Sequence, residues 1–316
     1  MTADPVRPER APPLHTYEVH ADAQGERLDK FLVGVQAELG RQGARWLTEQ
    51  GLVRVDGARA AKSRRLRAGE RVEVFGEWGG APPAEPDARL ALVLERPDLV
   101  VVDKPAGQAS APLGAVTSGT LAGALLGRYP EMRALGYRSR EPGLLHRLDT
   151  STSGLVLAAR TQRAFETLRQ ALAEERLHKR YLAIVADEQL PAAALLEQLL
   201  APHASGSGRV VVAASEQVSG ARFCRSRVRT LERHGRWALV EVEASRAYRH
   251  QVRVQLAAAG WPIAGDREYG GSVAAALEDR HALHASHLGW EGDGGVPPFV
   301  ADSPLPSDLR AFLELG

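Results

Sequence analysis

The stretch PGLLHRLDTSTSGLVLAART, from Pro142 to Thr161, places the single carboxylate of Asp149 between an arginine-bearing tripeptide and a run of small hydroxyl residues. Its second half, GLVLAART, carries a continuous apolar run that predicts a buried strand. An Asp followed by Thr-Ser-Thr-Ser-Gly is ordinarily a turn residue, because its side chain bonds nearby backbone groups. Two interpretations of Asp149 therefore stand at this point, a turn residue or a catalytic carboxylate, and distant segments must separate them.

The segments around this stretch predict a domain with more strands than helices. LALVLERPDLVVVDKPAG indicates two strands around a Pro-Asp turn, and KRYLAIVA, ARFCRSRVRTLER and RWALVEVEAS indicate three more. The helices are expected in TLAGALLGRYP, QRAFETLRQALAEERL and HQVRVQLAAAG. Because the strands come in adjacent runs instead of alternating with helices, we expect an α+β fold with a mixed or antiparallel sheet.

The chain divides into a small and a large domain, as its 316 residues suggest. Residues 1–16 are polar and rich in proline and predict a flexible tail. Residues 17–75 predict helices followed by a hairpin that turns at Asp56-Gly57. Residues 76–89 have the Gly, Pro and Ala composition of a linker, and residues 90–316 form the second domain.

Composition excludes several classes of protein. A hydrophobic content of 44% and a charged content of 25% are those of an ordinary globular protein. The one cysteine, Cys224, cannot form an intramolecular disulfide and is expected to be a small buried residue. The first residues lack the apolar core of a signal peptide, and no segment approaches the ~20 apolar residues of a membrane span. We therefore expect a cytoplasmic protein with no membrane contact.

Basic residues gather in two places although the net charge is only +1. Between Arg59 and Arg71, six basic residues stand against one acid, Glu70, which indicates either a solvated face or a surface that grips phosphates. Arg225, Arg227 and Arg229 alternate along a predicted strand and so share one face, which suits either a polyanion or solvent.

Reactive side chains concentrate in HRLD (146–149), HKRY (178–181) and RAYRHQVR (246–253). The chain offers no nucleophile elbow for a Ser-His-Asp triad and no glycine-rich nucleotide loop. His281, His284 and His287 recur every three residues, but with no acidic ligand beside them they indicate a surface or packing stripe and not a metal site. A glycoside hydrolase would need two carboxylates. One Asp beside arginines, which keep it ionised, suits chemistry at an electron-poor sugar carbon.

Together these motifs resemble those of the RluA-type pseudouridine synthases. The family's core is His-Arg-Leu-Asp followed by Thr-Ser-Gly, and LVVVDKPAG, LHKRYLAIV, RHQVRVQLAAAGWPIAGDREYG and RHALHASHLGW are similar to its other motifs in the same order. ERLDKFL and GLVRVDGARAAKSRRLRAGERVEVF resemble the small RNA-binding domain of the ribosomal S-four type. The resemblance implies a pseudouridine synthase fold. It also implies an enzyme that isomerises specific uridines in structured ribosomal or transfer RNA, without a cofactor or a metal. We expect the protein to act as a monomer.

The resemblance also assigns roles to individual residues. Asp149 is implied to be the catalytic aspartate, acting at the sugar or the base. Tyr181 is implied to stack on the base and to assist proton removal from C5, and Arg253 to pair with the aspartate. The residues implied or expected to contact RNA are Arg147, which takes part in base flipping, together with His146, Lys104, His250, Gln251, Arg64 and Arg65.

Three departures from the family pattern surround these residues. Arg246-Ala247-Tyr248-Arg249 stands where relatives carry Thr-Gly-Arg-Thr, Thr150-Ser151 where they carry Lys-Asp, and Ala111-Pro112 where they carry His-Pro. They bear on substrate choice more than on activity, and Arg246 or Arg249 is a candidate replacement for the missing guanidinium. Two alternatives stay open: an RNA-binding or ribosome-assembly factor with a decayed pocket, and a hydrolase that acts on nucleosides.

Overall fold

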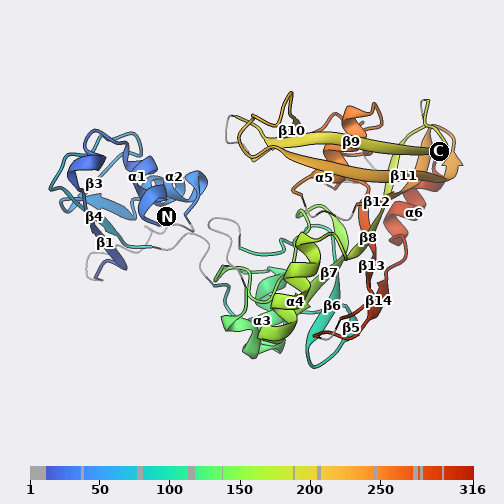
Figure 1. Ribbon diagram of the computed structural model, residues 1–316, viewed down its shortest axis with the longest axis horizontal. Coiled ribbons are helices and arrows are strands. Elements are labelled where there is room, and N and C mark those ends of the chain that lie inside the picture. The colour runs from blue at the N-terminus through green and yellow to red at the C-terminus, as the bar shows by residue number, and fades with distance from the viewer. Residues whose placement is uncertain are drawn as a thin grey trace, which may run out of the picture. The chain divides into compact units, whose positions relative to one another are not determined.

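The computed structural model describes residues 12–316 apart from 37–38, 77–80, 113–117, 137, 188, 205–207, 245, 247, 273–276, 278–279 and 294. These residues belong to two compact units (Figure 1), one made of the described residues of Met1–Ala81 with Pro112, and one made of Pro82–Ala111 and Ser118–Gly316. The change from one unit to the other, at Ala81–Pro82, falls inside the segment whose composition predicts a linker. None of the helices in the described part of the chain has the length and apolar character of a membrane span.

The first unit is a four-stranded antiparallel sheet with two α-helices. Its elements are β1 (His15–Glu18), a 3-10 turn (Ala21–Ala23), α1 (Leu28–Val35), α2 (Arg41–Glu49), β2 (Val53–Val55), β3 (Ala58–Arg59) and β4 (Arg71–Val74), with strand order β1-β4-β2-β3. Leu28, Leu32 and Leu47 of the helices pack against Val53 and Val72 in one core. Strand β1 begins at His15, so two residues that the sequence analysis placed in the tail pair with β4 instead, because their backbone bonds complete that edge of the sheet.

The second unit is built on a ten-stranded mixed sheet. Its strand order is β10-β9-β11-β12-β8-β13-β7-β6-β5, and β14 pairs with β13. All pairings described in this sheet are antiparallel except that of β7 with β13. The strands are β5 (Leu92–Glu95), β6 (Leu99–Lys104), β7 (Ser153–Ala159), β8 (His178–Ala186), β9 (Ala193–Pro202), β10 (Val210–Val212), β11 (Arg222–His234), β12 (Trp237–Glu243), β13 (Leu283–Trp290) and β14 (Phe299–Asp302). The expected α+β fold with a mixed sheet is confirmed.

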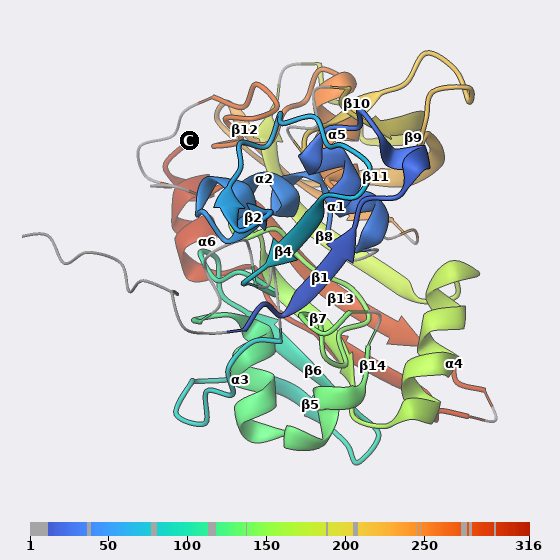
Figure 2. The same cartoon turned by 90° about the vertical axis from the view of Figure 1, so that its left-hand side faces the viewer.

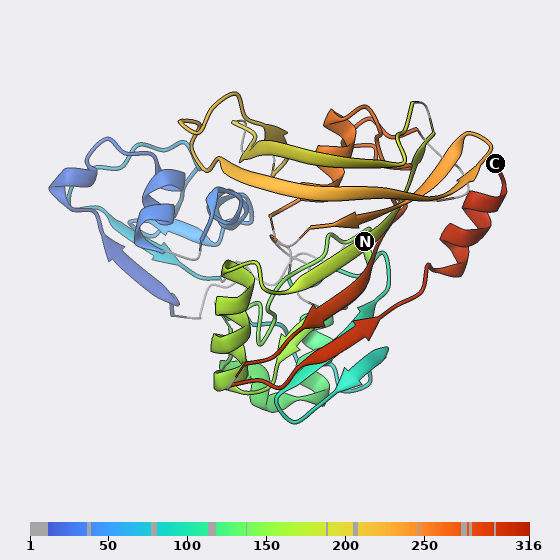
Figure 3. The same cartoon turned by 45° about the vertical axis from the view of Figure 1, so that its right-hand side comes forward.

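Helices cover both faces of this sheet. They are α3 (Leu121–Arg128), followed by a 3-10 turn (Pro130–Ala134), α4 (Gln162–Ala173), α5 (Gln251–Ala258) and α6 (Ser307–Glu314). Alternate residues of β6 and β7 face opposite ways, so Val102 and Val156 pack with α3 whereas Val101 and Leu157 pack with α4. Figure 2 shows α3 and α4 on the two sides of these strands, and Figure 3 shows α6 at one end of the long β11–β12 pair.

The arginine stripe of β11 lies on one exposed face, as its alternation predicts. Cys224, Ser226 and Val228 point into the core between these arginines. Each arginine meets a glutamate of a neighbouring strand: Arg225 with Glu197, Arg227 with Glu243 and Arg229 with Glu241. The stripe is therefore a ladder of ion pairs and not a bare basic surface.

The order of the central strands brings the motifs together. Tyr181 of β8 pairs with Ala285 of β13, and Ala285 pairs in turn with Gly154 of β7. Gly154 has φ of 114°, and a Cβ there would lie 2.2 Å from the carbonyl oxygen of Ala285. Only glycine permits this approach. The loop that carries Asp149 thus enters the sheet two strands away from Tyr181.

Candidate active site

Asp149 is both a turn residue and a charged side chain aimed at a partner. Its carbonyl accepts a hydrogen bond from the Thr152 amide at 3.0 Å, which closes the turn through the main chain. The carboxylate is not used by this turn, and its Oδ2 accepts a hydrogen bond from Arg253 Nη1 at 2.7 Å. The two interpretations of Asp149 are therefore compatible, because the turn uses the backbone and the ion pair uses the side chain.

A second loop holds this turn in place. The Ser110 hydroxyl donates to the Leu148 carbonyl at 2.8 Å and accepts from the Leu148 amide at 3.1 Å. The Gly107 amide donates to the carbonyl of Thr150 at 2.8 Å. Lys104, fully buried, directs Nζ to the carbonyls of Pro105, Gln108 and Thr150.

Arg253 is the centre of the ionic network. Its Nε and Nη2 bind the two oxygens of Asp266 at 2.7 and 2.8 Å, and Nη2 also reaches Glu268 Oε2 at 3.0 Å. The side chain of Arg253 is 8% exposed and that of Asp266 1%, whereas Asp149 keeps 29%. The cation is thus enclosed by protein, while the carboxylate of Asp149 remains accessible to a ligand.

The network keeps Asp149 ionised. Burial alone would raise the pKa of this carboxyl, but His250 and Arg253 outweigh burial and hold the pKa below its ordinary value. The pKa of Arg253 is raised, because its bonds to Asp266 and Asp149 more than offset its burial. At neutral pH the site therefore presents a carboxylate anion with one oxygen bound to a permanent cation.

The charge of Asp149 also affects the pKa of Tyr181. Burial, and then the charge of Asp149, raises the pKa of the Tyr181 phenol to about 12. The ring packs with two apolar clusters, one containing Ala183 and Leu283 and the other Ala285. Tyr181 therefore stands beside Asp149 as a neutral phenol with a fixed ring.

His250 joins the wall of the site at the start of α5. It adopts a left-handed conformation, with φ of 55°, immediately before the helix begins. Its Nδ1 lies 2.8 Å from the Tyr269 hydroxyl and its Nε2 lies 3.5 Å from Asp149 Oδ1. Burial lowers the pKa of His250, with the charge of Asp149 opposing this shift. His250 therefore precedes helix α5 and does not belong to it, yet its side chain and that of Arg253 both reach the carboxylate of Asp149.

Three residues expected to contact RNA are engaged inside the protein instead. The contacts of Lys104 position the loops around Asp149. His146 accepts the Leu157 amide on Nε2 at 3.1 Å, and burial lowers its pKa to about 3. Gln251 is 4% exposed and donates to the carbonyl of Arg225 and the hydroxyl of Ser226. These contacts support a positioning role for all three, since they leave little of each side chain for RNA.

Three more of the seven residues expected to contact RNA lie on the surface of their own units: Arg147, Arg64 and Arg65. Arg147 is 45% exposed and bonds Glu141 at 3.0 Å. In the first unit, Arg64 bonds Glu70 at 2.9 Å and Arg65 donates to the carbonyl of Gly25 at 2.8 Å.

Several residues of the network carry no expected role from the sequence. These are Asp266, Glu268 and Tyr269, all within the quoted GDREYG motif, and Thr152, whose Oγ1 lies 2.6 Å from Nε2 of His281; His281 was expected only as part of a surface or packing stripe. The motif itself was the available signal, because a buried arginine requires carboxylate partners.

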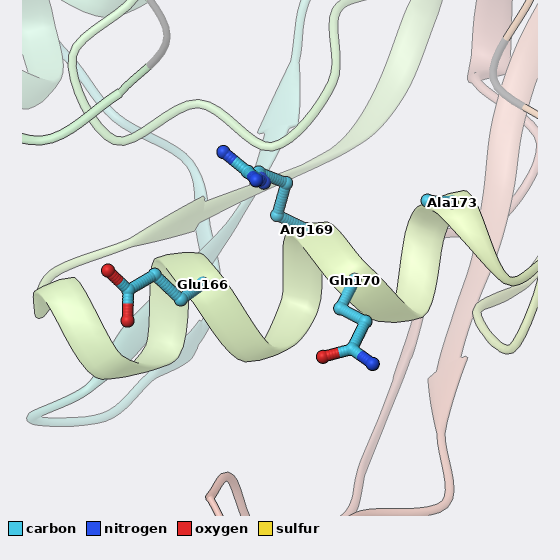
Figure 4. Close-up of a pocket in the computed structure, with 4 residues that line it drawn as sticks. All are labelled: Glu166, Arg169, Gln170 and Ala173. Carbon is cyan, nitrogen blue, oxygen red and sulfur yellow. The ribbon is translucent and has the colours of Figure 1, made fainter.

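Among the described residues, no group of three or more His, Cys, Asp or Glu side chains is arranged to hold a metal ion. His281 and His284 are buried, and His287 lies 2.6 Å from Asp302. A hollow of about 590 Å³ is lined by Glu166, Arg169, Gln170 and Ala173 of α4 (Figure 4), none of which belongs to the network around Asp149.

Known proteins are similar to this chain in sequence and in fold. Residues 98–258 match the family model described as RNA pseudouridylate synthase. An "uncharacterized RNA pseudouridine synthase" of Chloroflexus aurantiacus is 34% identical over 92% of this chain and 89% of its own. Ribosomal large subunit pseudouridine synthase D of Nitrosomonas europaea is 30% identical over 92% of this chain and 84% of its own. The solved structure of human RNA pseudouridylate synthase domain containing 1 covers 70% of this chain and 85% of its own, with a TM-score of 0.55 and 22% identity, and shows the same fold.

Proposed function

The chain belongs to the RNA pseudouridylate synthase family, whose members isomerise uridine in RNA, and we propose that its substrate is ribosomal RNA of the large subunit and its catalytic residue Asp149. The named substrate of two relatives supports this RNA class: the enzymes of Nitrosomonas europaea and Xanthomonas campestris, each 30% identical over 92% of this chain, are both named for the large ribosomal subunit. Transfer RNA is the other class that the sequence leaves open.

The ion pair between Asp149 and Arg253 is the observation that carries the catalytic assignment. At 2.7 Å, and with Arg253 enclosed, the pair fixes one carboxylate oxygen and keeps the group charged. Burying ions opposes folding unless they are paired. A protein that had lost its catalytic activity would therefore not be expected to retain a buried arginine that three carboxylates neutralise. The geometry therefore favours an enzyme over a passive RNA-binding factor.

The reaction needs nothing beyond what the site holds. The bond between C1′ of the ribose and N1 of uracil breaks, the base turns, and a bond forms between C1′ and C5. A proton leaves C5 and N1 gains one, so atoms and charge balance without a co-reactant. Asp149 acts at the sugar or the base, and Tyr181 packs beside the turned ring and assists the proton transfer at C5.

The target uridine must leave its stack to reach this carboxylate, as for other enzymes that act on a base. Arg147, exposed near the Asp149 turn, is placed to contact the RNA during this rearrangement. We assign the gripping of RNA phosphates outside the site to the first unit, through exposed arginines such as Arg65. An S-four-like role for this unit follows from its resemblance and from its helices and hairpin.

The test is pseudouridine mapping by mass spectrometry on large-subunit ribosomal RNA incubated with purified protein. Asp149→Asn preserves the shape of the side chain and removes its charge, and is expected to lower product formation at least 10³-fold. Asp302→Asn is the control, since the side chain of Asp302 is 67% exposed and its one ion-pair partner among the described residues is His287, which is not part of the network around Asp149. Full activity of Asp149→Asn would refute the catalytic assignment. RNA binding by the wild type with no pseudouridine in any RNA would favour the passive factor, and release of free uracil would reveal a hydrolase.

A further inference from the structure

We propose that Arg249, together with Arg209, binds a backbone phosphate of the substrate RNA at the rim of the site. The inference rests on the proposed function and adds to it a phosphate-binding pair. Arg249 belongs to the Arg246–Arg249 segment in which this chain departs from its family's pattern. Arg209 comes from the loop before β10, forty residues earlier in the chain.

The imidazole of His250 lies between the guanidinium of Arg249 and the carboxylate of Asp149. Its Nε lies 3.4 Å from His250 Nε2, and the same nitrogen of His250 lies 3.5 Å from Asp149 Oδ1. The guanidinium also rests against the backbone of Gly208, because a Cβ at that position would lie 2.8 Å from Arg249 Nη2. The head group is thus held beside the site while the residue as a whole is exposed.

Arg209 follows Gly208 in the loop before β10 and lies on the same side of the site as Arg249. Its guanidinium lies over the ring of Tyr269, 5.2 Å from the centroid. Tyr269 in turn contacts His250 through its hydroxyl and accepts the Val210 amide at 3.0 Å. Two arginines from distant parts of the sequence therefore flank the His250–Tyr269 pair, which itself adjoins Asp149.

The ion pairs of this region show why Arg249 differs from its neighbours. Arg246 bonds Glu175 at 2.8 Å, and the three arginines of the β11 stripe each meet a glutamate. Among the described residues, no carboxylate lies within ion-pair distance of Arg249. An exposed guanidinium held in place without an anion is suited to take one from a ligand.

The charge balance of the site calls for such a group. Three carboxylates, Asp149, Asp266 and Glu268, surround the single guanidinium of Arg253. Burial lowers the pKa of His250, so Arg253 is the permanent cation of this network. An RNA strand that delivers a uridine to Asp149 brings further negative charge, which is repelled unless cations meet its phosphates. Arg249 and Arg209 supply these cations.

The experiment measures RNA affinity as a function of salt with the full-length protein and transcribed large-subunit ribosomal RNA. Arg249→Gln is expected to weaken binding on the order of ten-fold. It should also flatten the slope of log affinity against log salt by about 0.7–0.9, the loss of one phosphate contact. Arg209→Gln should do the same. Arg249→Lys should retain the slope, since it retains the charge, while losing part of the affinity. In turnover assays, Arg249→Gln should raise KM more than it lowers kcat.

The control is Arg236→Gln. Arg236 is also exposed and stacked on an aromatic ring, 4.9 Å from the centroid of Trp237, but it lies at the opposite end of β12 from Tyr181. Its removal should leave the salt slope unchanged. A slope for Arg249→Gln equal to that of the wild type would overturn the proposal even if the enzyme is active. If the wild type binds RNA but forms no pseudouridine, the proposed function fails, and the salt slopes still decide whether Arg249 binds phosphate.

Discussion

Replacing Asp266 with asparagine tests whether the buried ionic network positions the catalytic carboxylate. Asp266 is 1% exposed, binds Arg253 through both oxygens at 2.7 and 2.8 Å, and also accepts the Glu268 amide at 3.2 Å. Asparagine has the same shape but carries no charge and places an NH₂ group where Arg253 needs an acceptor. One of the two bonds to Arg253 must therefore be lost or reversed.

The magnitude follows from burial and from the partners that remain. Breaking a buried ion pair by removing one member destabilises a protein by about 3–5 kcal/mol. Arg253 keeps Asp149 at 2.7 Å and Glu268 at 3.0 Å, so we expect the lower end, about 3 kcal/mol in the free energy of unfolding. The guanidinium is also free to turn toward its remaining partners, and a displacement of about 1 Å at Asp149 lowers kcat by about 10²-fold.

The assays are urea denaturation and single-turnover pseudouridine formation. Glu232→Gln is the matched control, because Glu232 also binds an arginine, Arg310, through both oxygens, at 2.6 and 3.2 Å, with both side chains 38% exposed. An exposed pair contributes about 0–1 kcal/mol, so this variant should change neither stability nor kcat appreciably. If Asp266→Asn behaved like Glu232→Gln in both assays, the network would not hold Asp149, and the reasoning from burial would be refuted.

Two further predictions follow from the pKa values of buried groups. Tyr181→Phe keeps the aromatic ring but removes the hydroxyl, whose pKa is about 12. Because the hydroxyl is proposed to take part in proton transfer, the variant should lower kcat by about 10²-fold at unchanged RNA affinity. An unchanged kcat across pH 6–9 would restrict Tyr181 to stacking. Lys179 is buried, its Nζ has no hydrogen-bond partner among the described residues, and burial lowers its pKa to about 7. In the unfolded chain the Lys179 ammonium keeps its proton up to a pKa of about 10.4, whereas in the folded chain it loses the proton near pH 7. Between pH 7 and 10 the free energy of unfolding of the wild type should therefore rise by a few kcal/mol relative to that of Lys179→Met, as measured by urea denaturation. A difference between the two proteins that stays constant with pH would contradict the shift.

The candidate site could be predicted in part because its central residues stand in recognisable local motifs. Asp149 was open to two interpretations on its own, and the motifs around Tyr181 and Arg253 favoured catalysis through resemblance. The contact between Asp149 and Arg253 joins residues 104 positions apart. No local pattern reports such a distance, since it depends on how helix α5, which packs on β9, β10 and β11, folds against the loop before β7.

The roles expected for the surrounding polar residues could not be settled in the same way. Lys104 and Gln251 stand in motifs next to the site, and from the sequence a charged or amide group near a catalytic residue suggests a contact with RNA. Their environments show carbonyl and hydroxyl partners inside the fold. Whether a polar side chain meets solvent or a buried acceptor is decided by segments packed on it from elsewhere in the chain.

By itself, the sequence determined the repeating patterns of this protein: the apolar runs of the central strands, the periodicity of α4, the turn at Asp56-Gly57 and the motifs that place it in its family. Only the tertiary structure decided what pairing and packing impose. Ala193–Pro202 is rich in good helix formers, yet it is strand β9 because β10 and β11 bond both of its edges. Likewise, Asp266 and Glu268 became partners of Arg253, and Arg249 came to lie against Gly208, because helix α5 and the loops around it fold against one another. Local propensity is a small free energy per residue, whereas ladder bonds and buried ion pairs are formed between distant segments and outweigh it.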